Sequence, residues 1–243
     1  MINALRVKLV KSLIDINEKL IFERRLRKFY KQKFEGNLDV IIDVGSNKGQ
    51  TIDFFLKLNP QCKIYGFEPN KALYQKLLTK YSNRPNIKLF NVGISDKTGC
   101  RLFYENILNY TSTFEKLNFR SDYLKTKATI LGVKPEELVI DSYLVDVITL
   151  SEFIEAHIKE PIDVLKIDVE GHEHSCLSGL FLKSFYQHVR YLQFERHHDD
   201  MYLHKIPFGS THNLLLTNNF NLVSVVKHGF GNLDEVIFKN SAS

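Results

Sequence analysis

The sequence predicts an α/β fold: a doubly wound, mostly parallel sheet with helices on both faces and an antiparallel C-terminal hairpin. Two observations support it. Five short apolar runs, most of which end in an acidic residue, alternate with helical patterns along the chain, as they do in βαβ units. Near the C-terminus, two further apolar runs flank a glycine-rich turn, which is typical of a hairpin. We therefore expect parallel strands joined by crossover helices, with one antiparallel edge.

The predicted elements follow one another in chain order. Each predicted strand is a short apolar run, and each predicted helix has apolar residues three or four positions apart. We expect strands at residues 39–43, 63–68, 87–92, 101–104, 141–149, 162–168, 189–195, 220–226 and 233–238, and crossover helices at 51–58 and 71–81. The hairpin turn then falls at 228–232.

The composition is that of a globular protein. The chain has 243 residues, of which 44% are hydrophobic and 25% charged, so it can bury a full-sized core and is neither disordered nor fibrous. Cys62, Cys100 and Cys176 lie far apart without a CxxC pair, which argues against a disulfide framework or a thiolate zinc site. No apolar run approaches the roughly 18 residues that cross a bilayer. We expect a cytoplasmic protein with neither a signal peptide nor a transmembrane segment.

Positive charge is concentrated at the N-terminus. Residues 1–35 have a net charge of +6, whereas residues 36–243 have a net charge of −1. Apolar residues in this segment recur with the period of an amphipathic helix, at Leu5, Leu9, Leu13, Ile16 and Leu20. We predict a basic helical segment at 1–35 that packs on the domain or on a second copy, as a homodimer. Peripheral contact with an anionic membrane is the alternative.

A turn with two glycines follows the first predicted strand and reads DVGSNKG over residues 43–49. Gly45 and Gly49 allow the backbone to approach a ligand. Glu68 ends the second strand, where a carboxylate can accept two hydrogen bonds from a ribose diol. The nucleotide fingerprints GxxxxGK[ST] and GxGxxG are both absent. Because Asp43 would repel phosphate and attract an ammonium group, we expect a ligand such as S-adenosylmethionine.

Five segments stand out by their order and spacing. They are DVGSNKGQ at 43–50, FEP at 67–69, NVGISD at 91–96 with Gly99, VITL at 147–150 and KIDVEGHE at 166–173. Over about residues 38–200 the sequence thereby resembles the FkbM family of S-adenosylmethionine-dependent methyltransferases. The resemblance implies a class I, Rossmann-like domain with a seven-stranded sheet over 36–243. It also implies methyl transfer to a hydroxyl of a sugar, glycolipid or natural product.

The resemblance further implies which residues hold the cofactor. Asp43 would hold the methionine ammonium, Glu68 the ribose hydroxyls, and Asp168 would lie beside the methyl donor. The other implied cofactor residues belong to two turns: Gly45, Ser46, Asn47 and Gly49 around the methionine moiety, and Asn91, Val92 and Gly93 around the adenine. Asn91 is equally suited to be a strand-end cap.

Transfer to an alcohol requires a group that takes the hydroxyl proton. Carboxylates and imidazoles gather directly after the strand at 162–168, at the ligand edge of the predicted sheet. We predict Asp168 or Glu170 as the general base. His172 is the next candidate, since an imidazole suits proton transfer at neutral pH. Glu173 is better explained as an acid at a helix N-terminus.

Seven of the nine histidines lie between residues 172 and 212, close to Glu195, Asp199 and Asp200. This clustering leaves a divalent metal site as an alternative. However, no HExxH or other fixed ligand spacing occurs, and ERHHDD at 195–200 also suits a solvated loop after the fifth strand. We therefore predict no metal, and we expect His197 and His198 to be candidates for substrate contact.

Residues 105–140 are an insertion between two short predicted strands. Aromatic residues in it alternate with basic ones, which favours a saccharide or glycolipid acceptor, although Phe114 and Phe119 are equally suited to cover the core. No nucleic-acid partner is expected, because the domain itself is not basic. The rival functions are a nicotinamide-dependent oxidoreductase and a non-catalytic nucleotide-binding module.

Overall fold

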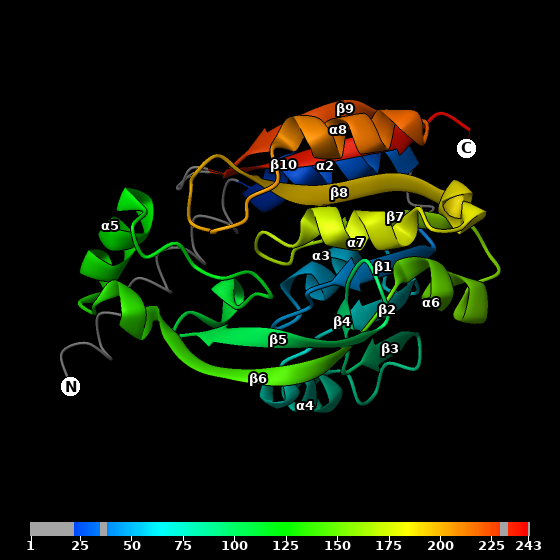
Figure 1. The fold of residues 1–243 in the computed structure, drawn as a ribbon. Helices are drawn as coiled ribbons and strands as arrows, with labels where there is room; N and C mark the ends of the chain where they lie inside the picture. The colour runs from blue at the N-terminus through cyan, green and yellow to red at the C-terminus, as the bar shows by residue number, and fades with distance from the viewer. Residues whose placement is uncertain (1–21, 35–37, 229–232, 243) are drawn as a thin grey trace.

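A seven-stranded sheet forms the centre of the computed structural model, which describes residues 22–34, 38–228 and 233–242. Its strand order is β3-β2-β1-β7-β8-β10-β9 (Figure 1). The strands are β1 Val40–Val44, β2 Lys63–Phe67, β3 Ile87–Phe90, β7 Ile162–Ile167, β8 Val189–His197, β9 Phe220–Lys227 and β10 Leu233–Asn240. All neighbours are parallel up to β8, whereas β10 is antiparallel to both β8 and β9. The predicted Rossmann-like fold with an antiparallel C-terminal edge is confirmed.

Helices cover both faces of this sheet because its central strands are apolar on both sides. The helices are α2 Glu23–Phe34, α3 Gln50–Leu58, α4 Lys71–Lys80, α6 Leu150–His157, α7 Glu173–Leu180 and α8 Phe208–Thr217. In β1, Val40 and Ile42 pack with α6 and α7, whereas Ile41 between them packs with α2, α3 and α4. Within the described ranges, no helix combines the length and apolar character needed to cross a membrane.

Helix α2 belongs to the core of the domain. Its Leu26, Tyr30 and Phe34 are buried against the sheet and α3, so this last part of the basic N-terminal segment packs on its own domain. The apolar stripe predicted from Leu5 to Leu20 lies outside the described residues. Its partner, a second copy or a membrane, stays a prediction.

We expect Tyr30→Phe to lower the free energy of unfolding by about 1–3 kcal/mol. The fully buried Tyr30 hydroxyl donates a hydrogen bond to the side-chain oxygen of Gln193, and the substitution leaves that buried oxygen without its donor. Urea denaturation followed by circular dichroism measures the change, with Tyr74→Phe on the half-buried side of α4 as the matched control. Equal midpoints for the two variants would contradict a stabilising role of this hydrogen bond.

The insertion forms an arm beside the main sheet. Strand β5, Gly99–Asn106, is antiparallel to β6, Val139–Ile148, which is also paired with the two-residue strand β4, Gly93–Ile94. Between β5 and β6 lie the short 3-10 helices η2 Asn109–Thr111 and η3 Pro135–Leu138 and the helix α5, Asp122–Leu131. Figure 1 shows α5 at the far end of the two strands. Within this arm, β4 and α5 were not predicted from the sequence.

The arm has a small apolar core of its own, which Met201 and Tyr202 extend from the segment after β8. Phe114 packs on Gly93, where an added Cβ would lie 2.5 Å from its ring, and on Phe103. Phe119, in contrast, is largely exposed. Of the two aromatic residues suggested to cover the core, only Phe114 does so.

Candidate functional site

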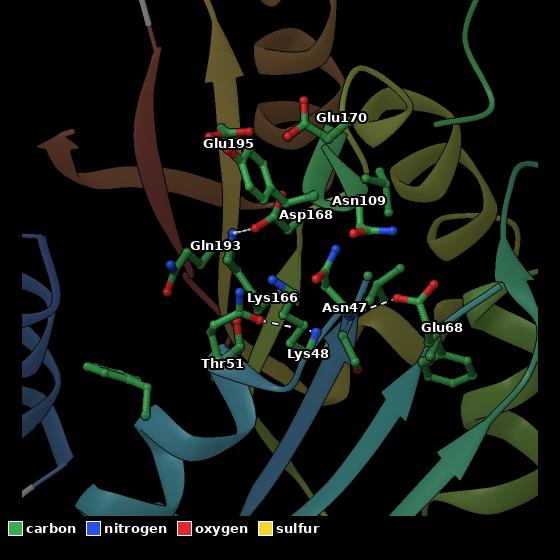
Figure 2. Close-up of a pocket in the computed structure, with 18 of the residues that line it drawn as sticks. Asn47, Lys48, Thr51, Glu68, Asn109, Lys166, Asp168, Glu170, Gln193 and Glu195 are labelled. Carbon is green, nitrogen blue, oxygen red and sulfur yellow. Dashed lines mark hydrogen bonds and ion pairs between the residues drawn. The ribbon is translucent and has the colours of Figure 1, made fainter. Parts of the chain in front are cut away.

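A cavity of about 800 Å³ opens at the carboxyl ends of β1, β2 and β7 (Figure 2). Its walls are the turns after these strands, parts of β8 and β10, the insertion, and residues of the helices α2 and α3. The volume is in the range of small-molecule sites, roughly 300–1,000 Å³. The position is the one at which doubly wound sheets bind ligands, since the order of strands reverses at β1.

The turn after β1 is clamped between the ends of β2 and β7. The amides of Gly45 and Ser46 both donate to the Phe67 carbonyl, at 3.0 and 2.9 Å. Gly45 has a φ of 88°, and a Cβ there would lie 1.9 Å from the Asp168 carbonyl oxygen. Glycine is therefore required by contact with the β7 turn as well as by backbone conformation. This contact places Asp168 directly beside the Gly45 turn.

Glu68 connects the turns after β1 and β2. Its two carboxylate oxygens accept hydrogen bonds from the backbone N–H groups of Asn47, at 2.7 Å, and of Asn70, at 2.8 Å. Burial raises the pKa of Glu68 to about 7, against the effect of these amides. Each oxygen retains a second lone pair, so the residue can still accept hydrogen bonds from a ligand.

Asp43 lies within β1, beneath the Gly45 turn. It is fully buried, and neither carboxylate oxygen has a hydrogen-bond partner in the described part of the chain. Burial raises its pKa to about 7. A buried carboxylate without a partner is costly, and a cationic ligand group or a water molecule would satisfy it. Asp43 and Gly49 are absent from the described residues that line the cavity, whereas Gly45, Ser46 and Asn47 line it.

Asp168 begins the turn after β7 and belongs to a chain of polar contacts. The buried Lys166 ammonium lies 3.4 Å from Asp168 and 2.7 Å from Glu235. Burial opposes charge on Lys166, but Asp168 and Glu235 raise its pKa overall. Gln193 donates to the other Glu235 oxygen at 3.0 Å. Lys166 thus holds the Asp168 carboxylate, which is partly exposed to the cavity.

Glu170 also lines the cavity and has an unusual backbone conformation, with a φ of 54°. Its carboxylate accepts a hydrogen bond from the Tyr202 hydroxyl at 2.8 Å, and its carbonyl accepts one from Thr113 at 2.7 Å. Burial raises the pKa of Glu170 to about 7, against the lowering effect of His197. Both the insertion and the segment after β8 therefore position this residue.

His172 lies outside the described cavity lining and is fully engaged. One ring nitrogen is 2.9 Å from the Ser95 hydroxyl and the other 2.7 Å from a Glu115 oxygen. The side chain thereby links the insertion to the loop after β4. This imidazole stabilises the contact between the insertion and the loop after β4, and it is not placed to receive a proton from a substrate.

The residues directly after β3 have two different roles. Val92 and Gly93 line the cavity. The side-chain amide of Asn91 donates hydrogen bonds to the backbone carbonyls of Glu68 and Pro69, at 2.8 and 3.1 Å. This is the strand-end cap that the sequence offered as the alternative role of Asn91. Asn91 is not among the described lining residues.

Glu195 and His197 lie in the last part of β8. The solvated loop suggested by the sequence for residues 195–200 therefore does not begin until after His197. Both side chains are buried, and Glu195 lines the cavity. Glu195, His197 and Asp199 are each two residues apart. In a strand, residues at this spacing point to the same face of the sheet, so the sequence could have indicated that these side chains lie together. Asn109 and Tyr110, from the insertion predicted to bind the acceptor, also line the cavity.

Comparison with known proteins bears on this site. Residues 43–221 match the family model described as the methyltransferase FkbM domain. The chain is 24% identical over 191 residues to the 2-O-methyltransferase NoeI of Sinorhizobium fredii, which covers 78% of this chain and 75% of that protein.

Two solved structures match this chain. The crystal structure of a methyltransferase FkbM from Methylobacillus flagellatus KT has a TM-score of 0.51 and 15% identity, over 83% of this chain and 43% of that chain. This chain therefore spans less than half of that protein. Fibrillarin of Aeropyrum pernix, with natively bound S-adenosyl-L-methionine, has a TM-score of 0.45 and 13% identity over 83% of this chain and 66% of that chain.

Proposed function

We propose an acceptor class and catalytic roles for this chain, which belongs to the FkbM family of S-adenosylmethionine-dependent methyltransferases. The proposed acceptor is a hydroxyl group of a saccharide or glycolipid. The observation that carries the proposal is the close approach of Gly45 to the Asp168 backbone carbonyl. It places Asp168, whose carboxylate is partly exposed to the cavity, beside the turn that would hold the methionine end of the cofactor. Family membership decides against the rival oxidoreductase.

The residues present fit the cofactor. When bound, S-adenosylmethionine supplies an electrophilic methyl group on a sulfonium centre. The unpartnered carboxylate of Asp43 would compensate the methionine ammonium, through water where the turn intervenes, and Glu68 would accept hydrogen bonds from the ribose hydroxyls. Val92 would offer apolar contact to the adenine.

Asp168 would receive the proton that the acceptor hydroxyl loses. An alcohol is a weak nucleophile while protonated, and a carboxylate within hydrogen-bond reach corrects this. Lys166 keeps the Asp168 side chain in place. The remaining contribution is positioning, since the acceptor oxygen must be held in line with the methyl group.

The insertion would bind the acceptor. Asn109 and Tyr110, both from the insertion, line the cavity (Asn109 is labelled in Figure 2). Tyrosine rings pack well on sugar faces, and an amide side chain can hydrogen bond to hydroxyls. The 2-O-methyltransferase relative supports oxygen as the methylated atom.

Product analysis tests this function. The protein is incubated with methyl-labelled S-adenosylmethionine and a panel of saccharides, glycolipids and small amines, and the products are identified by NMR. We expect label in a methyl ether of a hydroxyl-bearing acceptor. Label found only on nitrogen or carbon would overturn the proposal.

We expect the affinity for S-adenosylhomocysteine to rise with pH. Asp43 and Glu68 bind the ligand best when ionised, and burial raises both pKa values to about 7. For one such group the ionised fraction rises about tenfold between pH 6 and pH 8, so Kd should fall at least that much. Isothermal titration at both pH values measures it, and Asp43→Asn should flatten the dependence. An equal Kd at the two pH values would rule out this role for the carboxylates.

A further inference from the structure

A cluster of metal-ligating side chains lies at one end of the cavity. Glu170 comes from the turn after β7, and Glu195 and His197 from the same face of the adjacent strand β8. One donor atom from each lies within 4.8 Å of the others. His197 Nε2 is 3.2 Å from Glu195 Oε2 and 3.9 Å from Glu170 Oε2. We call these three residues the carboxylate–histidine cluster.

Atoms in the cluster are buried without well-formed hydrogen bonds. The side chains of Glu170, Glu195 and His197 are only 12%, 9% and 6% exposed. In the described part of the chain, neither nitrogen of His197 makes a hydrogen bond of good geometry, and neither does Glu195 Oε2. Their contacts are ion pairs, at 3.2 Å between His197 and Glu195 and 3.7 Å between His197 and Asp199. Buried polar atoms without well-formed hydrogen bonds destabilise a fold. A bound ion would satisfy both side chains at once.

Negative and positive side chains both lie around the cluster. The carboxylates of the cluster and of Asp199 surround a single imidazole. The buried Lys166 ammonium is bound to Glu235, and the His228 ring nitrogen is 4.0 Å from the other Glu195 oxygen. A divalent cation bound between the three side chains would add to the compensation that Lys127 gives Glu170 and Lys205 gives Asp199.

Neighbouring side chains orient two members of the carboxylate–histidine cluster, as is usual for metal ligands. Asp199 Oδ2 lies 3.7 Å from His197 Nδ1, so a carboxylate faces the nitrogen that points away from Glu195. The Tyr202 hydroxyl donates to Glu170 at 2.8 Å. A metal-binding histidine is usually oriented by a carboxylate or carbonyl on its other nitrogen, and ligating carboxylates are themselves hydrogen bonded.

We propose that Glu170, Glu195 and His197 bind a divalent transition-metal ion of the Mn²⁺ and Zn²⁺ class. Imidazole nitrogen suits these ions, whereas Mg²⁺ and Ca²⁺ prefer sites made of oxygen alone. The donor atoms lie within 4.8 Å of one another, and rotation of the side chains would have to bring them to the metal–ligand distances of about 2.0–2.2 Å found in zinc sites. Three protein ligands leave a coordination position open.

The open position faces the cavity, because Glu170 and Glu195 both line it. Figure 2 shows both carboxylates on the same side of Asp168. An ion there would bind the acceptor oxygen and favour loss of its proton, which Asp168 would take up. This last role rests on the proposed function, whereas the metal site itself does not.

Metal binding is measured on the full chain after chelator treatment and dialysis, without cofactor or acceptor. Titration with MnCl₂ followed by electron paramagnetic resonance counts bound Mn²⁺, and competition with ZnCl₂ and MgCl₂ ranks the ions. We expect one saturable Mn²⁺ per chain that Zn²⁺ displaces and equimolar Mg²⁺ does not. Absence of saturable binding would overturn the proposal, and displacement by equimolar Mg²⁺ would overturn the assigned class of ion.

Variants locate the site. Glu170→Gln, Glu195→Gln and His197→Ala should each weaken Mn²⁺ binding at least about tenfold, by loss of one ligand. The first two are nearly isosteric, and thermal melting verifies that they remain folded. His198→Ala is the matched control, because its ring contacts Asp234 outside the cluster and Mn²⁺ affinity should not change. Unchanged affinity in all three ligand variants would overturn the site.

One further variant separates the two proposals. Asp168→Asn should lose turnover and keep its Mn²⁺. Methylation of an acceptor other than a hydroxyl would refute the proposed function and leave the metal measurement unaffected. An active enzyme without saturable Mn²⁺ binding would refute the metal site alone.

Discussion

Asp168→Asn is expected to lower turnover about 100-fold or more while the affinity for S-adenosylhomocysteine changes much less. The substitution keeps the size of the side chain and removes its ability to take a proton, and general-base contributions are typically about 10²–10⁴-fold. Asp168 is partly exposed to the cavity and adjoins the Gly45 turn. Single-turnover kinetics with labelled cofactor measure the chemical step, and isothermal titration measures the binding.

His172→Asn serves as the comparison for this prediction. Both nitrogens of His172 are occupied by Ser95 and Glu115, so its loss should lower stability and leave the pH dependence of the remaining turnover unchanged. The assignment of the base to Asp168 is wrong if the His172 variant loses turnover without losing stability while Asp168→Asn stays active.

Asp43→Asn and Glu68→Gln are each expected to weaken cofactor binding by about 1–3 kcal/mol, which is roughly 5- to 150-fold in Kd. Glu68→Gln removes a negative charge at the cavity wall, and Asp43→Asn removes a buried one behind the Gly45 turn that would compensate the methionine ammonium. The effect of Glu68→Gln should be the larger, because Glu68 also holds the amides of Asn47 and Asn70 and with them the shape of two turns. Isothermal titration with S-adenosylhomocysteine at pH 8 gives both values.

Asp43→Asn also has an effect on stability that is separate from its effect on binding. The pKa of Asp43 in the folded state, about 7, exceeds the ordinary value of 3.8, so its ionisation destabilises the fold increasingly as pH rises between these values. At pH 8 the Asp43→Asn variant should therefore be no less stable than the parent in urea denaturation. A large loss of stability there, or wild-type cofactor affinity in both variants, would contradict the roles given to the two carboxylates.

Most of the fold follows from patterns that are local in the sequence. The apolar runs at 63–68 and 162–168 match β2 and β7 to within one residue, because a buried parallel strand is apolar on both faces. The two-residue strand β4 is too short to carry such a pattern. Helix α5 has apolar residues at helical spacing, Leu124, Ala128 and Leu131, but its place beyond the main sheet separates it from the alternation that identified the other elements.

The sequence by itself determined the class of the fold, the turn after each parallel strand and, through the five segments from Asp43 to Glu173, the family. These features depend on periodicity, on conformations that only glycine adopts freely and on residues close together in the chain. Only the tertiary structure decided which side chains meet. It brought Glu170 beside Glu195 and His197, Lys166 beside Glu235, and His172 into the insertion through Glu115. The physical reason is that these contacts join neighbouring strands or distant loops, whose register is set by packing of the whole core rather than by any local pattern.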